Sequence, residues 1–235
     1  MSHAEALPHG GIEEVLPNIF FVTGTMTAEF FDAPWQFGRN MTIVREGDEL
    51  TVINSVRLDD AGLKQLEALG KVTSVVRIGS LHGRDDAFYV DRYQPTYWSL
   101  RGAPPNGVKV DEELRADALP LRDASLFSFE HTKLPETILR LDRDGGVMIA
   151  CDALQNWAEP DAFTDAATQA KMKDMGFYTP ANVGVAWRLM NEAKAEDFAR
   201  LKQVSFQHAL CGHGAPLRAT AQAGYHATFK RLFDV

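Results

Sequence analysis

The sequence predicts a layered protein of the α/β or α+β class. Strand-like runs dominate the first half, helical patterns gather between residues 161 and 204, and a strand followed by a helix closes the chain. This order favours helices packed on sheets over an all-β protein. We expect residues 1–235 to form a single domain, because this length suits one large domain.

In the first half, β-rich runs predict strands at 18–23, 40–45, 50–55 and 72–78. The turn signal at 46–49 joins the second and third of these strands as a hairpin. Asp59 or Asp60 is the expected cap of a short helix, whose leucines recur every three residues until Gly70. The stretch 101–117 is rich in glycine and proline, and we expect a loop there.

In the second half, alternation predicts a strand at 125–131, and 137–141 pairs with 147–150 around the glycine-containing turn 142–146. Helices are expected from Asp161 or Thr164 to Met175, and over 180–193, 196–204 and 219–233. A further strand ends at Cys211.

Composition excludes several classes of partner. The formal net charge is −8 and no run of Lys or Arg stands out, so nucleic acid is not an expected partner. No stretch approaches the roughly 18 apolar residues of a membrane span. The first residues lack the basic and apolar parts of a secretory signal, and two cysteines are too few for a disulfide framework. We therefore expect a cytoplasmic protein, without a membrane partner, that acts on a small molecule; the oligomeric state is left open.

Residues that bind metals follow several of the predicted strands. His82, Asp85 and Asp86 come after the strand at 72–78, Asp152 comes after 147–150, and His213 comes after the strand that ends at Cys211. Strands that end in such residues place them on one rim of a sheet, where a cation can collect them. Both cysteines adjoin these segments, but buried packing is the commoner role of a free cysteine.

The chain resembles the metallo-β-lactamase fold hydrolases over most of its length. Residues 15–22 and 50–55 are similar to the family's opening strands, and Gly212-His213-Gly214-Ala215-Pro216 looks like its strand-end Gly-His-Gly-x-Pro motif. Glu130-His131-Thr132 looks like its isolated histidine loop, and Cys151-Asp152-Ala153-Leu154 looks like its aspartate motif. The resemblance implies an α+β fold, a four-layer αβ/βα sandwich, with His82, His131, Asp152 and His213 converging.

One motif departs from the family pattern His-x-His-x-Asp-His. With His82 at the second histidine, Ser80 stands at the first, Arg84 at the aspartate and Asp85 at the last histidine. Serine is a poor zinc ligand and arginine cannot be one. We therefore expect at most one tightly held metal, with Asp85 or Asp86 supplying an oxygen in place of an imidazole.

The expected donor set of histidines and carboxylates suits one divalent cation, zinc first, with iron or manganese as alternatives. Such a site would activate water against a small ester, lactone or phosphoester, with Asp152 in a catalytic role. The alternative is a non-catalytic relative that binds a metal or another ligand as a binding or assembly module.

Each of these residues also has an ordinary structural interpretation. His82 and His131 could be surface or turn histidines, because histidine serves many roles. One of Asp85 and Asp86 could cap a helix, and Asp152 could cap a turn. His213 is the strongest single signal, because its flanking glycines permit close backbone approach.

Overall fold

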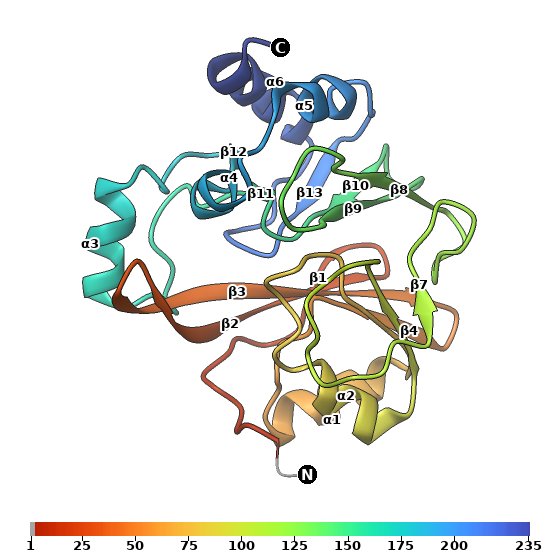
Figure 1. The fold of residues 1–235 in the computed structure, drawn as a ribbon. Helices are drawn as coiled ribbons and strands as arrows, with labels where there is room; N and C mark the ends of the chain where they lie inside the picture. Colours follow the sequence, from red (N-terminus) through yellow and green to blue (C-terminus); the bar gives the residue numbers. More distant parts are fainter. Residues whose placement is uncertain (1–2) are drawn as a thin grey trace.

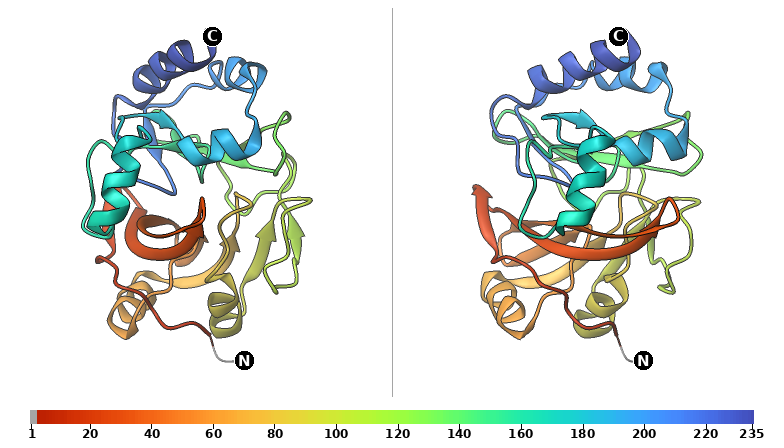
Figure 2. Two further views of the ribbon diagram at one scale, coloured as in Figure 1. Left: turned by 60° about the vertical axis from the view of Figure 1, so that its left-hand side comes forward. Right: turned by 90° about the vertical axis from the view of Figure 1, so that its left-hand side faces the viewer.

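The computed structural model describes residues 3–235. Two β-sheets lie face to face, and helices cover the outer face of each (Figure 1). The views in Figure 2 show the same order of layers, with the first described residues and the C-terminus on opposite sides of the molecule. The protein is therefore an αβ/βα sandwich of the α+β class, which confirms the predicted fold class.

The first sheet contains seven strands in the order β1 to β7. These are β1 Glu13–Leu16, β2 Ile19–Phe30, β3 Ala33–Glu46, β4 Glu49–Ile53, β5 Lys71–Val76, β6 Thr96–Ser99 and β7 Glu112–Glu113. Helix α1, Asp60–Leu69, links β4 to β5, and helix α2, Asp86–Tyr93, links β5 to β6. The Asp59 carboxylate accepts a hydrogen bond from the Gly62 amide at 2.8 Å, which confirms the predicted helix cap.

The second sheet has the order β13–β10–β9–β8. Its strands are β8 Ala124–Ser128, β9 Thr137–Leu141, β10 Val147–Ile149 and β13 His208–Leu210. Strands β9 and β10 form the predicted hairpin, and β10 runs parallel to β13. Helices α4 Val185–Asn191, α5 Ala195–Leu201 and α6 Ala221–Phe233 contribute side chains to the core on the outer face of this sheet. Helix α3, Ala166–Asp174, lies beside β3 (Figure 1).

Alternating side chains on each strand build the layers. In β2, Ile19 and Phe21 face the second sheet, whereas Phe20 and Val22 join the core beneath α1 and α2. Successive side chains of a strand point to opposite faces, so one apolar run supplies two cores. The candidate site residues follow the carboxyl ends of β5, β10 and β13, at the edge of this layered core.

The hairpin of β2 and β3 is much longer than the predicted strands 18–23 and 40–45. Its pairing runs from Ile19 with Val44 to Phe30 with Ala33. The tip is formed by Phe31 and Asp32, which have φ angles of 51° and 56°. Both central residues of a type I′ turn need positive φ, and Phe-Asp lacks the Asn-Gly chemistry that signals such a turn in a sequence.

Three other segments also differ from the predictions. The predicted loop 101–117 contains β7, and β6 was not predicted at all. The predicted helix 180–193 begins only at Val185, because Asn182–Val183 pairs as β12 with β11, Leu154–Gln155. Within residues 3–235, no helix is long and apolar enough to cross a membrane.

Candidate functional site

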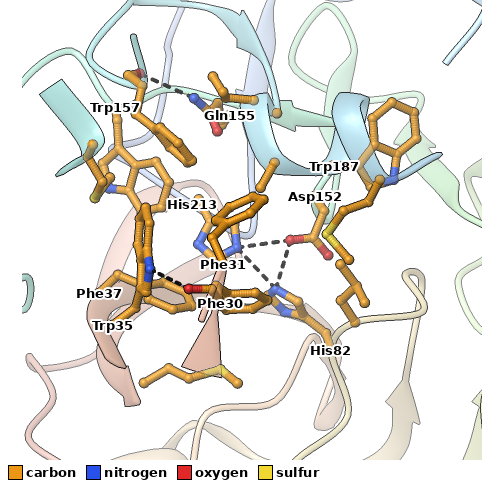
Figure 3. A pocket seen from close by; sticks show the side chains of 18 residues that line it. Phe30, Phe31, Trp35, Phe37, His82, Asp152, Gln155, Trp157, Trp187 and His213 are labelled. Carbon is orange, nitrogen blue, oxygen red and sulfur yellow. Dashed lines mark hydrogen bonds and ion pairs between the residues drawn. The ribbon is translucent and has the colours of Figure 1, made fainter. Parts of the chain in front are cut away.

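Three strand ends deliver His82, Asp152 and His213 to one place. Because β10 and β13 run parallel, their carboxyl ends meet at the same edge, and Asp152 and His213 follow them there. His82 arrives from the first sheet, after β5. We call these three residues the donor triad; Figure 3 shows their side chains pointing toward one another.

The donor atoms of the triad are close enough to share one ion. The Nε2 atoms of His82 and His213 lie 3.3 Å apart. Oδ1 of Asp152 lies 3.0 Å from Nε2 of His213 and 3.5 Å from Nε2 of His82. Ligands bound tetrahedrally at about 2.0–2.1 Å are separated by about 3.3–3.4 Å. The spacing of the three atoms therefore fits one four-coordinate cation with a fourth position left for water or substrate.

The backbone of β3 orients His213. Nδ1 of His213 lies 2.9 Å from the carbonyl oxygen of Gly38. A carbonyl can only accept, so Nδ1 donates and Nε2 keeps the lone pair that a metal requires. Nδ1 of His82 is buried and has no hydrogen-bond partner within the described part of the chain.

Burial and charge set the protonation of the triad. Burial lowers the pKa of His82, with Asp152 opposing part of that change, so the neutral, metal-binding form is favoured at neutral pH. Burial alone would raise the pKa of Asp152, but His82 and His213 outweigh it and hold this pKa well below its usual range. Asp152 is therefore an anion beside two imidazoles.

Two buried ionisable residues, Cys151 and Glu136, lie near Asp152, although the sequence analysis did not place them in the site. Sγ of Cys151 is 3.3 Å from Oδ2 of Asp152, and donor atoms of His82, Cys151 and Asp152 all lie within 4.8 Å of one another. Burial raises the pKa of the Cys151 thiol well above its usual value, so the thiol stays protonated and packs in the core. Burial also raises the pKa of Glu136, whose carboxyl accepts a hydrogen bond from the Ala153 amide. No pattern around Glu136 in the sequence signals this position.

The structure does not bring His131 to the triad. Its side chain is 48% exposed, and its Nδ1 lies 3.3 Å from Oδ1 of Asp197, in α5. The Asp197 carboxylate also accepts hydrogen bonds from the backbone amides of Glu130 and His131, which fixes the loop against α5. The expectation that His131 is a ligand is therefore not supported by its placement.

Asp85 and Asp86 are likewise engaged away from the triad. The Asp85 carboxylate forms ion pairs with Arg39 and Arg84. Asp85 stands at the N-cap of α2, but its side chain makes no cap hydrogen bond. We expected one of the two aspartates to supply a metal ligand. The Asp85 carboxylate is instead already paired with two guanidinium groups.

Asp86 belongs to a separate buried polar cluster. Its carboxyl oxygens accept hydrogen bonds from the hydroxyls of Ser55 at 2.5 Å and Tyr97 at 2.7 Å, and from the Asn106 amide at 3.1 Å. Burial raises the pKa of this carboxyl despite these bonds. These partners come from the segment after β4, from β6 and from the loop after β6, so Asp86 ties α2 to all three segments.

An apolar pocket adjoins the donor triad (Figure 3). One wall comes from the β2–β3 hairpin and the other from the segment around α3 and α4. Its non-polar lining residues are Met26, Phe30, Phe31, Trp35, Phe37, Leu81, Trp157, Met172, Phe177, Gly184, Val185, Ala186, Trp187 and Met190. The polar lining consists of the triad and Gln155. The triad therefore lies at the polar end of a mostly apolar pocket.

In fold, the chain is similar to solved metallo-β-lactamases. The DIM-1 metallo-β-lactamase exposed to ceftazidime matches with a TM-score of 0.61 and 12% identity, covering 97% of this chain and 99% of that chain. FIM-1 from Pseudomonas aeruginosa, in its mono-zinc form, matches with a TM-score of 0.59 and 13% identity over 98% of each chain. A metallo-β-lactamase from Erythrobacter litoralis matches with a TM-score of 0.57 and 13% identity, covering 97% and 96%.

No protein-family model matches the sequence, and no curated protein matches it. At 10–14% identity, the structural likeness establishes the fold. The protein therefore has the metallo-β-lactamase fold, as the resemblance in its sequence predicted.

Proposed function

We propose that this protein is a metal-dependent hydrolase that uses one divalent cation, zinc in the first place, held by His82, Asp152 and His213. The observation that carries the proposal is the mutual spacing of their donor atoms, 3.0 to 3.5 Å, which suits a single tetrahedral ion. The mono-zinc form among the structures of similar fold supports a one-metal site of this kind. The substrate is a small ester, lactone or phosphoester.

The cation would supply Lewis-acid activation of water and of the scissile carbonyl or phosphoryl group. The chain's own residues position the donor atoms and set the charge around them. The Gly38 carbonyl accepts a hydrogen bond from Nδ1 of His213, which keeps Nε2 directed at Asp152 and His82. Asp152 stays ionised because its pKa is low, so it supplies negative charge and not a proton. The apolar lining of the pocket would reduce the water around a bound substrate, which would strengthen electrostatic interactions in the site.

The second candidate is a protein that binds a metal or a small ligand without hydrolysis. It is favoured by the ion pairs of Asp85 with Arg84 and Arg39, because Arg84 and Asp85 stand where the family motif carries two further ligands. A one-metal site with fixed positive charge beside it could hold a ligand without reacting with it.

The deciding experiment measures metal content and hydrolysis in one preparation, purified without chelator. A panel of a lactone, a thioester, a carboxylic ester and a phosphodiester is assayed with wild type, His213→Ala and His131→Ala. Hydrolysis by wild type and His131→Ala, but not by His213→Ala, supports the hydrolase. Bound metal without turnover of any substrate supports the second candidate. A protein that takes up no metal refutes the hydrolase and the metal-binding form of the second candidate, and leaves only the binding of a small ligand.

A further inference from the structure

The apolar pocket contains no residue that would neutralise an anion. Among residues 3–235, no Lys or Arg lines it, and its one charged lining residue is Asp152. An anionic group placed there would lose its hydration and gain no partner, which costs several kcal/mol or more. The positive charge of a bound cation would act at the triad end of the pocket only, so the far end selects for uncharged groups.

The cations that lie around the site are already engaged elsewhere. Lys171 places its ammonium 5.6 Å from the centroid of the Trp35 ring, but this ammonium donates to the Pro34 carbonyl at 2.9 Å. Arg39 and Arg84 are both paired with Asp85. None of these three side chains lines the pocket, so none can pair with an anionic group bound in it.

The shape of the pocket further restricts what it can hold. The cavity volume is about 70 Å³, so the pocket is narrow. The rings of Trp35 and Trp157 both adjoin Phe177, with centroids 6.0 and 5.9 Å away. A narrow apolar cavity walled by packed aromatic rings suits a flat aryl group or an unbranched alkyl chain and disfavours a bulky polar one.

We propose that the substrate is an uncharged molecule whose aryl or linear alkyl group occupies the apolar pocket while the scissile bond lies at the donor triad. This inference rests on the proposed function for the reacting end and on the pocket alone for the apolar end. The pocket thus discriminates by charge as well as by size, because an acidic substituent on the apolar group finds no counterion.

Binding to metal-free protein tests the pocket without any chemistry. The probes are 2-naphthylmethanol and 2-naphthoate, which share one ring system and differ in charge. Quenching of tryptophan fluorescence reports binding, because Trp35, Trp157 and Trp187 line the pocket. We expect the neutral probe to bind at least about 10-fold more tightly, a difference of about 1.4 kcal/mol. Equal affinities, or preference for the anion, would overturn the inference.

Three variants locate the binding. Phe31 and Leu189 are matched exposed apolar residues, 53% and 58% exposed, but only Phe31 lines the pocket. Phe31→Ala should weaken the neutral probe several-fold, whereas Leu189→Ala should leave it unchanged. Met26→Lys puts a cation on a half-buried position of the hairpin wall and should reduce or reverse the preference over naphthoate. An unchanged preference in Met26→Lys together with unchanged affinity in Phe31→Ala would place the probe elsewhere and refute the assignment.

Hydrolysis of a matched ester pair separates this inference from the proposed function. 4-Nitrophenyl butyrate and the 4-nitrophenyl monoester of succinic acid differ in a terminal carboxylate. We expect metal-loaded protein to favour the neutral ester at least about 10-fold in kcat/KM. Hydrolysis of both at equal rates refutes the charge discrimination and leaves the hydrolase intact. A naphthyl preference without hydrolysis of either ester or of any substrate in the panel above refutes the hydrolase and leaves the pocket assignment intact.

Discussion

The Nε2 atoms of His82 and His213 lie 3.3 Å apart although 131 positions separate the two residues in the chain. His82 follows the first sheet and His213 follows the second, so this contact spans the interface between the sheets. Two imidazole lone pairs repel at this distance unless a proton or a cation lies between them. An ion bound here would therefore tie the two halves of the sandwich together.

Metal binding should accordingly stabilise the fold as well as complete the site. We expect one equivalent of zinc per chain and, at a free zinc concentration about 100 times the Kd, a gain of about 2.7 kcal/mol in the free energy of unfolding. Elemental analysis after gel filtration and thermal unfolding with and without zinc measure the two effects. A second equivalent of tightly held metal would contradict the one-metal site.

Ligand variants test which histidine belongs to the triad. His213→Ala should weaken zinc binding by more than about 100-fold, because loss of outer-shell partners alone costs about 10–100-fold. His131→Ala is the matched control, since its imidazole contacts Asp197 and is half exposed. Zinc titration with a competing chelator gives both affinities. Equal losses of zinc affinity in the two variants would show that His131 is also a ligand.

The ion pair between Arg39 and Asp85 should contribute to stability and not to metal binding. Arg39 and Asp85 have side-chain exposures of 1% and 3%, so Asp85→Asn leaves a buried guanidinium short of its counterion. We expect a loss of about 3–5 kcal/mol in unfolding free energy. Asp117→Asn removes the partner of Arg115 in an exposed pair and should cost less than about 1 kcal/mol. Urea unfolding measures both, and zinc stoichiometry of folded Asp85→Asn should remain one.

Gly184 should be essential for the position of Asp152. A Cβ atom at residue 184 would lie 1.9 Å from the carbonyl oxygen of Asp152, a backbone atom that cannot rotate away. Gly184→Ala should therefore destabilise the fold by about 1–3 kcal/mol and weaken zinc binding by displacing Asp152. At Gly11 a Cβ would meet nothing within 4 Å, so Gly11→Ala is the control. Normal zinc affinity in Gly184→Ala would show that the loop adjusts without moving Asp152.

Asp197 should show a defined pH dependence. Burial would raise its pKa, but Arg200 and the backbone amides of His131 and Glu130 outweigh burial and lower the pKa below 3.8. A carboxyl whose pKa is lower in the folded state contributes stability above its unfolded pKa and loses it as pH falls through its folded pKa. Asp197→Asn should cost about 2–3 kcal/mol at pH 7, and this deficit should shrink below about pH 4. Urea unfolding across pH 2.5–8 checks this; a deficit that is independent of pH would contradict it.

Local patterns in the sequence were sufficient for several of the regular elements. The paired strands β9 and β10 and the helix capped by Asp59 are set by alternation, turn residues and one capping carboxylate, all within a few residues. The outer half of the β2–β3 hairpin was not predicted, because prediction depended on local signals that are absent there. Its tip, Phe31-Asp32, carries no local turn signal, and its register depends on pairing along the whole hairpin.

The sequence by itself determined that His82, Asp152 and His213 follow strand ends, because strand period and strand termination are local properties. Only the tertiary structure decided which candidates meet. His131 contacts Asp197, which is 66 residues away in the sequence. Asp85 pairs with Arg39, which is 46 residues away. A buried charged group pairs with the group of opposite charge that packing places next to it. That packing is set by contacts between segments distant in the sequence. The tertiary structure brings three of the six candidate ligands together, and it builds the apolar pocket beside them from a hairpin and two helices that no local pattern connects.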